Sequence, residues 1–256
     1  MKTEFLNRVK LCFRISSYLL NIGTIRFLDY ENLSNSLKSA GLDVLFINMV
    51  TSFFISLVLS LQIVKEFLYL NAVQLVSSML AISFIRELSP VLTAIITIGK
   101  VGSLFTSELG TMVITEQIDS LFILGISPIR YLIYPRVLAL ILALPLLNLF
   151  SLCTSLISSS FICFFLYQIS PNFFFMNLWY DNILFDLVKS SLKALIFGFC
   201  VSIISCVWGI TTSGGSRGVG LSTTSSVVTS LLLVFILNFF LSYFLFDNLS
   251  SSFSAL

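Results

Sequence analysis

Residues 67–107 read FLYLNAVQLVSSMLAISFIRELSPVLTAIITIGKVGSLFTS, and this stretch decides the class of fold. Apolar residues dominate it, and its charged residues are Arg86, Glu87 and Lys100. A membrane-spanning helix needs about 20 mostly apolar residues to cross a hydrocarbon core of about 30 Å. A charge at the centre of such a helix costs about 2.5–3.5 kcal/mol on insertion scales. The stretch therefore predicts a membrane helix, loosened near Pro90, whose central charges face protein or water.

The composition of the whole chain supports a membrane protein. Of its 256 residues, 57% are hydrophobic and 10% are charged, and the mean hydropathy is +1.03. Soluble domains carry roughly 25% charged residues. The net charge of +2 excludes an electrostatic nucleic-acid binder, and the lack of histidine excludes histidine-based catalytic triads and proton relays. We predict an all-α integral membrane protein with a single domain over 1–256, in which 1–40 is an interfacial region and 41–256 is transmembrane.

Further apolar runs and the basic residues predict the topology. Spans are expected at 44–64, at 137–169, at 192–212 and at 227–246, besides one in 67–107. Lys and Arg cluster before the first span, before the third and in the turn that contains Arg217. If all three groups lie on the inner side, even numbers of crossings must separate them. Five crossings result, with the N-terminus inside and the C-terminus outside. A sixth crossing would require 67–107 to split at its charged centre.

The N-terminal segment has the pattern of an amphipathic helix that lies in the membrane surface. Its apolar residues recur at helical spacing, and its polar residues fall on the opposite side; the apolar set is Phe5, Leu6, Val9, Cys12 and Phe13. A disordered basic tail is the alternative.

Arg86 and Glu87 are the least expected residues of the second span. Neighbouring residues on a helix point about 100° apart, so each needs a partner other than its neighbour. An interfacial loop between two short helices is the alternative interpretation. Further along, glycines permit close helix packing, and two charges mark the approach to the inner interface; these residues are Gly99, Lys100, Gly102, Glu108 and Gly110.

Residues 116–124 predict a short helix on the inner face, too short to span. Thr115 is the expected N-cap, and Glu116 and Asp119 favour the positive end of the helix dipole. Gly125 and Pro128 should end it. Its expected surface residues are Glu116, Gln117, Ile118, Asp119, Leu121 and Phe122, of which Ile118, Leu121 and Phe122 form an apolar stripe. This helix is either a docking element or a loop helix that rests on lipid.

The glycine-rich segment 212–220 predicts a tight inner turn anchored by Arg217. Its members are Gly214, Gly215, Arg217, Gly218 and Gly220. A phosphate-binding loop requires Gly-x4-Gly-Lys-Ser/Thr after a strand, and neither this segment nor Gly99-Lys100 meets that pattern. We therefore expect no ATPase activity, no catalytic residue, no cofactor and no metal in this chain.

Between residues 86 and 137 the order of motifs resembles the signature of the MlaE permease family, the membrane subunits of lipid-transporting ABC systems. The motifs are Arg86-Glu-Leu-Ser-Pro-Val-Leu-Thr-Ala, Gly99-Lys-Val-Gly, Glu108-Leu-Gly-Thr, Thr115-Glu-Gln-Ile-Asp-Ser-Leu, Pro128-Ile-Arg-Tyr-Leu and Pro135-Arg-Val-Leu-Ala. Lys193-Ala, Phe197-Gly and the segment 214–220 are also similar to the family. Ser89 stands where the family usually has Gly. Lys100 stands where it usually has Arg, which loses the bidentate fork.

The resemblance implies five spans after an interfacial helix, and a homodimer with a lipid pocket between the copies. It implies a separate ABC ATPase on the inner face, docked on the coupling helix 116–124, and a lipid-binding MCE-domain protein on the other side. A glycerolipid is the expected cargo, with Arg86, Glu87 and Pro90 at the lipid path. The chain is rich in Phe, Ile, Leu, Asn and Ser, a bias that matches AT-rich codons. This composition favours a plastid-encoded member in the inner envelope, with a bacterial inner membrane as the alternative.

Two other functions stay open from the sequence. An ion-coupled secondary transporter would use Arg86, Glu87 and Glu108 as a relay and would need no nucleotide-binding partner. A structural or assembly subunit of a membrane complex would bind no lipid at a dimer axis.

Overall fold

A computed structural model describes residues 8, 10–15, 30–176 and 183–246, and these form helices and short connections with no strand. Within this part of the chain, five helices are long and apolar enough to cross a membrane. They are Glu31–Tyr69, Leu75–Ile114, Ile129–Tyr167, Ile183–Ile210 and Gly215–Phe246. The predicted all-α membrane fold with five spans is confirmed. The region 67–107 contributes one continuous candidate span, so the sixth crossing is not needed.

Contacts group these helices into two compact units. One unit, called here the first unit, takes residues up to Val44 together with Ala94–Leu144 and Leu195–Phe235. The second unit takes Leu45–Thr93, Pro145–Ala194 and the chain from Ile236 onward. Each of the five candidate spans contributes a segment to both units.

The second span begins and ends as α-helix but contains two π-helical turns. It runs through α4 (Leu75–Ser83), a π-turn at Phe84–Leu88, α5 (Ser89–Thr97), a π-turn at Ile98–Gly102 and α6 (Ser103–Ile114). Both turns fall on motifs singled out from the sequence, Arg86-Glu87 and Gly99-Lys100. π-Turns inside helices are frequent at functional sites. The alternative of a loop at 86–90 is wrong, because the backbone stays helical there.

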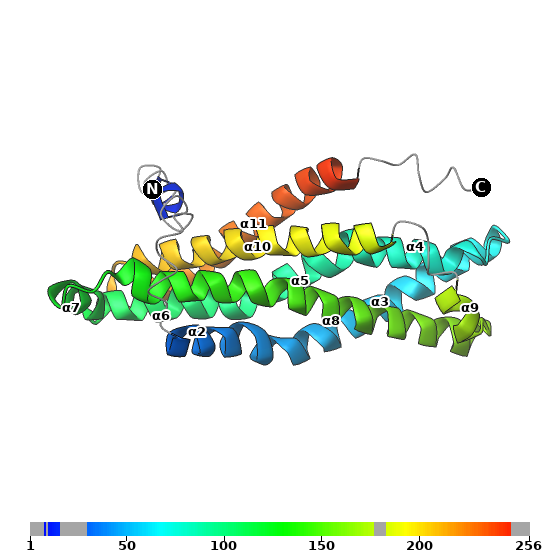
Figure 1. Ribbon diagram of the computed structural model, residues 1–256, viewed down its shortest axis with the longest axis horizontal. Coiled ribbons are helices and arrows are strands. Elements are labelled where there is room, and N and C mark those ends of the chain that lie inside the picture. Colours follow the sequence, from blue (N-terminus) through cyan, green and yellow to red (C-terminus); the bar gives the residue numbers. More distant parts are fainter. Residues whose placement is uncertain (1–7, 9, 16–29, 177–182, 247–256) are drawn as a thin grey trace. The chain divides into compact units, whose positions relative to one another are not determined.

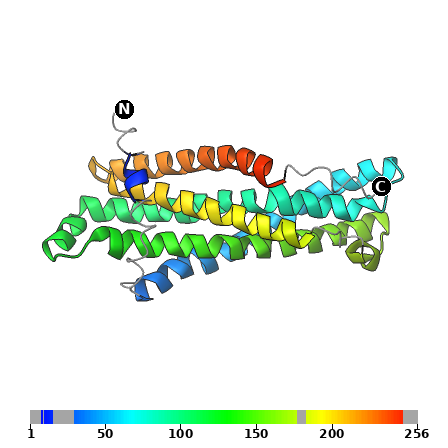
Figure 2. The same cartoon turned by 45° about the horizontal axis from the view of Figure 1, so that its top comes forward.

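In the first unit, α7 (Gln117–Ile123) is the predicted short helix. Figure 1 and Figure 2 both show it beyond the end of α6 and the first turns of α8 (Tyr134–Tyr167). Its end is as expected: Gly125 has φ +75°, its N–H donates to Phe122 O, and Ile126 N–H donates to Leu121 O. These two bonds form a Schellman motif.

The start of α7 differs from the prediction. Its N-cap is Glu116, which has φ 59° and makes no side-chain capping bond. Thr115 instead closes α6, with its hydroxyl donating to Thr111 O at 2.9 Å. The predicted Thr115 cap is wrong because α6 extends to Ile114 and the chain reverses at Glu116.

The glycine-rich segment is mostly helix rather than turn. α10 (Ile183–Ile210) ends at Ile210 and α11 (Gly215–Phe246) begins at Gly215, so the predicted turn over 212–220 is wrong beyond Gly214. Gly214 and Gly215 have φ of +92° and +69°, a region that glycine enters without steric cost. At Gly218 a Cβ atom would collide with Ser213 O. That glycine therefore lets the turn carbonyl close onto the first turn of α11.

Only part of the predicted N-terminal amphipathic helix is described, since Phe5, Leu6 and Val9 lie outside the described residues. Arg8 and residues 10–15 are helical. Cys12 and Ile15 pack on the apolar core of the first unit, whereas Phe13 is 76% exposed. The core that they join is Leu109, Ile133, Val137, Ile203, Ile204, Cys206, Val207 and Trp208.

The second unit has a core of its own. α9 (Pro171–Met176) packs against α4, and Phe174 of α9 is 1% exposed (Figure 1). α3 (Asp43–Tyr69) and α8 are joined by side-chain bonds to main-chain carbonyls: Asn48 Nδ2 donates to Leu147 O at 2.9 Å, and Ser158 Oγ donates to Phe53 O at 3.0 Å. The apolar core comprises Val64, Val76, Leu80, Ala81, Phe84, Ile85, Leu152, Cys163, Phe174 and Ile183.

Candidate functional site: a charge network inside a membrane span

Arg86 pairs with an aspartate of the fourth span. Its Nη2 and Nε lie 2.8 and 2.9 Å from Asp186 Oδ2. The two side chains are 15% and 3% exposed. A buried charge is tolerated when it is paired and hydrogen-bonded, and this pair meets both conditions.

Glu87 pairs with a lysine from the same fourth span. Lys193 Nζ lies 3.3 Å from Glu87 Oε2, and the lysine side chain is 0% exposed. Asn238 Nδ2 donates to the same oxygen at 3.0 Å, and Ser242 Oγ donates to Oε1 at 2.6 Å. We predicted that Arg86 and Glu87 would pair with other residues and not with each other, and this prediction is confirmed. The four charges sum to zero, so the network as a whole is neutral.

Pro90 explains why Lys193 also bonds to the main-chain carbonyl of Arg86. In a regular helix the carbonyl of Arg86 would accept from the N–H of residue 90, which proline does not have. Lys193 Nζ donates to this carbonyl at 2.9 Å and also to Ser242 Oγ at 2.8 Å. With Glu87, the ammonium group has an acceptor for each of its three protons.

A groove of about 450 Å³ runs beside the network in the second unit. The ring of Phe246 lies under three cations, with Arg86 Cζ at 5.1 Å, Lys189 Nζ at 5.5 Å and Lys193 Nζ at 5.8 Å from its centroid. One wall of the groove is thus charged, and the rest is aromatic or aliphatic apart from two serines. The lining residues are Ile82, Ser83, Arg86, Glu87, Phe239, Ser242, Tyr243 and Phe246.

Sequence reasoning did not identify the partners in this network. Asp186 and Lys193 are seven residues apart on α10, hence on one face of the helix, and both sit in an apolar span. Two opposite charges seven residues apart in one span could pair with the consecutive Arg86 and Glu87 of another span, and this was the signal in the sequence. Asn238 and Ser242 are four apart on α11 and gave no comparable signal, since single polar residues are common in membrane helices.

Ser89, where the resemblance expects Gly, is buried and bonded. Its hydroxyl donates to Asn148 Oδ1 at 2.6 Å and contacts Ser151 Oγ, and Asn148 Nδ2 donates to Ser190 Oγ at 3.0 Å. The serine thus joins the second span to the third through a polar contact that glycine could not make.

The glycines and charges nearer the C-terminal end of the second span belong to the first unit. A Cβ on Gly102 would meet Ser205 Oγ at 3.1 Å, and one on Gly110 would meet Thr212 Oγ1 at 3.1 Å, so both permit close packing. Gly99 faces open space among the described residues, so close packing does not explain it. Lys100 donates to Asp43 O. Glu108 pairs with Arg136 at 2.7 Å.

On α7, Ile118 is buried at 7% exposed and therefore does not belong to an exposed apolar stripe. Phe122, Ile123 and Leu124 are exposed by 64%, 87% and 70%. Leu121 is half-buried, and Glu116, Gln117 and Asp119 are exposed. Arg217 and Gly220 in the first turns of α11 are also on the surface of the unit. The expected stripe is shifted toward the C-terminal end of α7 by the burial of Ile118.

Comparison with known proteins identifies the family. The family model described as "Permease MlaE" matches residues 33–244. The probable ABC transporter permease protein ycf63 of Pyropia yezoensis is 43% identical over 97% of this chain and 93% of its own length. Its counterpart in Porphyra purpurea is 44% identical over 92% of this chain and 89% of its own length. The protein TRIGALACTOSYLDIACYLGLYCEROL 1, chloroplastic, of Arabidopsis thaliana is 41% identical over 87% of this chain and 64% of its own length. The chain belongs to the MlaE permease family.

Proposed function

We propose that this chain, acting as one permease domain over 1–256, is the membrane subunit of an ABC transporter that moves a glycerolipid. A separate ATPase subunit would supply the energy. The observation that carries the proposal is the neutral network of Arg86, Glu87, Asp186 and Lys193, placed in the membrane spans of an MlaE permease beside a mostly apolar groove.

The groove suits a lipid, because its two kinds of wall match the two parts of one. Aromatic and aliphatic side chains such as Phe239 and Tyr243 can contact acyl chains. Glu87 is 44% exposed, so its carboxylate remains reachable by the polar part of a lipid. A buried charge that is held by protein partners costs less to keep near lipid than an isolated one. The network thus places a polar group, the Glu87 carboxylate, beside the lipid path and satisfies it with protein partners instead of water.

Coupling to the ATPase is assigned to α7. Its exposed Phe122, Ile123 and Leu124 form an apolar end, and the exposed Glu116 and Asp119 lie at its start. Burying an apolar side chain in a partner's cleft stabilises docking by about 1.5–3 kcal/mol. ATP binding by the partner would then move α7 and, through α6 and α8, the lipid path.

The proposed assembly is a homodimer with a lipid pocket between its copies, a separate ATPase on the inner face and an MCE-domain protein on the other side. The apolar surface of α11 supports pairing of this kind, since only 11% of its most apolar window is buried within the chain. The proposed location is the plastid inner envelope, supported by the relative that is named as chloroplastic. A bacterial inner membrane is the alternative.

The testing experiment reconstitutes the affinity-purified complex in liposomes and follows ATP-dependent transfer of a fluorescent glycerolipid. Glu87→Gln should insert into the membrane and copurify with the ATPase but lose most lipid transfer. The double variant Glu87→Gln/Lys193→Met restores charge balance and should also be inactive. Lys189→Met, on the same helix and beside the same Phe246 ring, is the matched control and should transfer lipid normally.

Other results would reject the proposal. Recovery of transfer in the double variant would make the network a folding element only. Lipid or ion movement without nucleotide and without an ATPase partner would favour the secondary transporter. A purified complex that holds no ATPase and no lipid would favour a structural subunit.

A further inference from the structure

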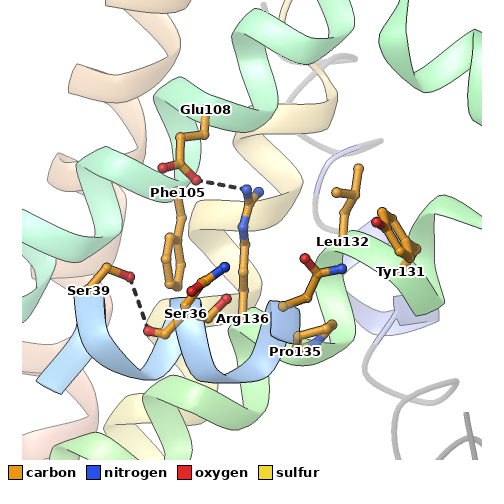
Figure 3. A pocket seen from close by; sticks show the side chains of 10 residues that line it. Ser36, Ser39, Phe105, Glu108, Tyr131, Leu132, Pro135 and Arg136 are labelled. Atoms are coloured by element: carbon orange, nitrogen blue, oxygen red, sulfur yellow. Dashed lines mark hydrogen bonds and ion pairs between the residues drawn. The ribbon is translucent and has the colours of Figure 1, made fainter. Parts of the chain in front are cut away.

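A polar pocket of about 190 Å³ lies in the first unit, apart from the charge network. Three helical segments form it: α2 (Tyr30–Leu37) with the turn after it, α6, and the start of the third span. Figure 3 shows Arg136 reaching toward Glu108, with the ring of Phe105 beside the arginine. The side chains that matter for binding are Asn35, Ser36, Ser39, Glu108, Tyr131 and Arg136.

One donor at this pocket is unsatisfied. Arg136 is 8% exposed, its Nη2 is bonded to Glu108 Oε2 at 2.7 Å, and its Cζ lies 5.4 Å from the centre of Phe105. Among the described residues, its buried Nη1 has no hydrogen-bond partner. Leaving a buried donor of a charged group unpaired costs more than about 1–3 kcal/mol, so an acceptor that came within reach of Nη1 would be favoured.

The depth of the pocket in the membrane follows from the span bounds. Residues 32–39 begin the first candidate span, 105–108 lie near the end of the second, and 131–136 begin the third. At 1.5 Å per residue, each segment lies within about 15 Å of its span end. Since the whole hydrocarbon core is about 30 Å thick and headgroups flank it, such a pocket lies within reach of lipid headgroups.

The charges and polar groups of the pocket select the class of ligand. Glu108 and Arg136 neutralise each other, so no net charge attracts an anion. The carboxylate of Glu108, 42% exposed, would repel a phosphate. The other groups are amides and hydroxyls, which both donate and accept. A hydroxyl suits this set, because it can accept from arginine and donate to glutamate.

We propose that this pocket binds an uncharged, polyhydroxylated group, the sugar headgroup of a neutral glycolipid. At about 30 Å³ per water molecule, 190 Å³ holds the equivalent of roughly six waters, which is room for one sugar ring. The lipid is a bound component that fixes α2 against α6 and the start of the third span. It is distinct from transported cargo, and the inference does not depend on the proposed function.

The test uses the full-length chain in phosphatidylcholine nanodiscs that contain equal fractions of a monohexosyl diacylglycerol and phosphatidylglycerol. Native mass spectrometry reports the lipid that stays bound, with no ATP and no ATPase present, so the result is separate from transport. We expect selective retention of the glycolipid. Asn35→Leu/Ser39→Ala should lower retention about tenfold, because it removes two polar contacts. Ser34→Leu, exposed on the same helix and outside the pocket, should leave retention unchanged.

A crosslinking measurement on the unmodified protein covers the case in which the double variant fails to fold. A glycolipid with a photoreactive sugar should label peptides that contain residues 32–39 or 131–136. Millimolar methyl hexoside in the buffer separates the two sources of the ligand. If methyl hexoside does not displace the glycolipid, the ligand is the headgroup of a lipid. If it does displace the glycolipid, the pocket binds a free sugar. Preference for phosphatidylglycerol, labelling elsewhere, or no retained lipid above the phosphatidylcholine background would overturn the proposal.

Discussion

Lys193 Nζ donates a hydrogen bond of 2.9 Å to the main-chain carbonyl of Arg86, and both residues lie inside membrane spans. The bond links the fourth span to the second at the point where Pro90 leaves a carbonyl without its usual helical donor. The lysine therefore donates both to the unpaired carbonyl of Arg86 and to the carboxylate of Glu87. Polar groups inside a membrane must find such internal partners, because lipid offers none.

Removal of Lys193 should destabilise the second unit. Lys193→Met leaves the Arg86 carbonyl without its donor and Glu87 without its cationic partner, although Asn238 and Ser242 still donate to Glu87. It should cost roughly 3 kcal/mol, the lower end for breaking a buried pair, because Glu87 is partly exposed. Adding Glu87→Gln should recover part of that loss. Thermal unfolding in detergent should give the lowest midpoint for Lys193→Met, with Lys189→Met close to the wild type. Equal midpoints for all variants would show that the network is not structural.

Docking of the ATPase should depend on the exposed end of α7. Phe122→Ala should weaken capture of the ATPase by about 30-fold if this side chain is a central anchor worth about 2 kcal/mol. Ile123→Asp, which places a charge at a position that is 87% exposed, should abolish capture while leaving insertion intact. Ser120→Asp is the control on the exposed polar side. Pull-down with the purified ATPase measures the effect, and wild-type capture by Ile123→Asp would remove α7 from the interface.

Two glycines of α11 should respond in opposite ways to alanine. At Gly218 the new Cβ would collide with Ser213 O, so Gly218→Ala should lower the unfolding temperature markedly. At Gly220 the Cβ would enter open space among the described residues, and alanine should raise helix stability by up to about 1 kcal/mol. Thermal unfolding of the two variants side by side tests the turn. A tolerated Gly218→Ala would show that the chain reverses differently at Ser213.

Single cysteines introduced at exposed connections should separate into two groups by side of the membrane. With five spans, Gln74→Cys and Ser170→Cys should react with an impermeant maleimide from the outer side. Ser127→Cys and Ser213→Cys should react only after permeabilisation. All four positions are exposed between candidate spans. A background in which the native cysteines are replaced by alanine is the control, and Ser127 and Ser170 on one side would contradict the topology.

The thiol of Cys12 should alkylate slowly near neutral pH. Burial raises the pKa of Cys12 from 9.0 to about 11, and only the thiolate is nucleophilic. At pH 8 about one thiol in a thousand is ionised, and the rate of alkylation should rise about tenfold per pH unit until pH 11. A variant whose sole cysteine is Cys12 tests this in detergent micelles, with the SDS-denatured protein as reference. A rate that levels off near pH 9 would mean that Cys12 is not packed on the core of the first unit.

Prediction from the sequence succeeded where one local property was enough. Apolar length gave the five spans, and the glycine at 125 gave the end of α7. It failed at Thr115 and at residues 215–220. At Thr115 the preceding helix α6 extends to Ile114, so this residue ends one helix instead of starting the next. At 215–220 the helix α11 already begins at Gly215 although glycines favour turns, because tertiary packing outweighs the small differences in helix propensity.

The candidate site was predictable in part. The sequence showed that Arg86 and Glu87 of the second span need partners, because an isolated charge in the membrane is costly. Those partners were not identified, because Asp186, Lys193 and Ser242 lie 100 or more residues further along the chain. Only the seven-residue spacing of Asp186 and Lys193 offered a signal. The exposed set on α7 was also misjudged at Ile118, since the periodicity of so short a helix does not indicate which of its apolar residues face the core.

Local apolar composition was enough to establish a membrane protein with five spans, because the bilayer requires long apolar helices that satisfy their own backbone bonds. The packing of the helices against one another sets which charges meet and which apolar residues stay exposed. It joined Arg86 to Asp186 and Glu87 to Lys193, and it left Nη1 of Arg136 without a partner among the described residues. The reason is physical: crossing a membrane depends on local composition, whereas pairing depends on the rotation and register of helices that are distant in sequence.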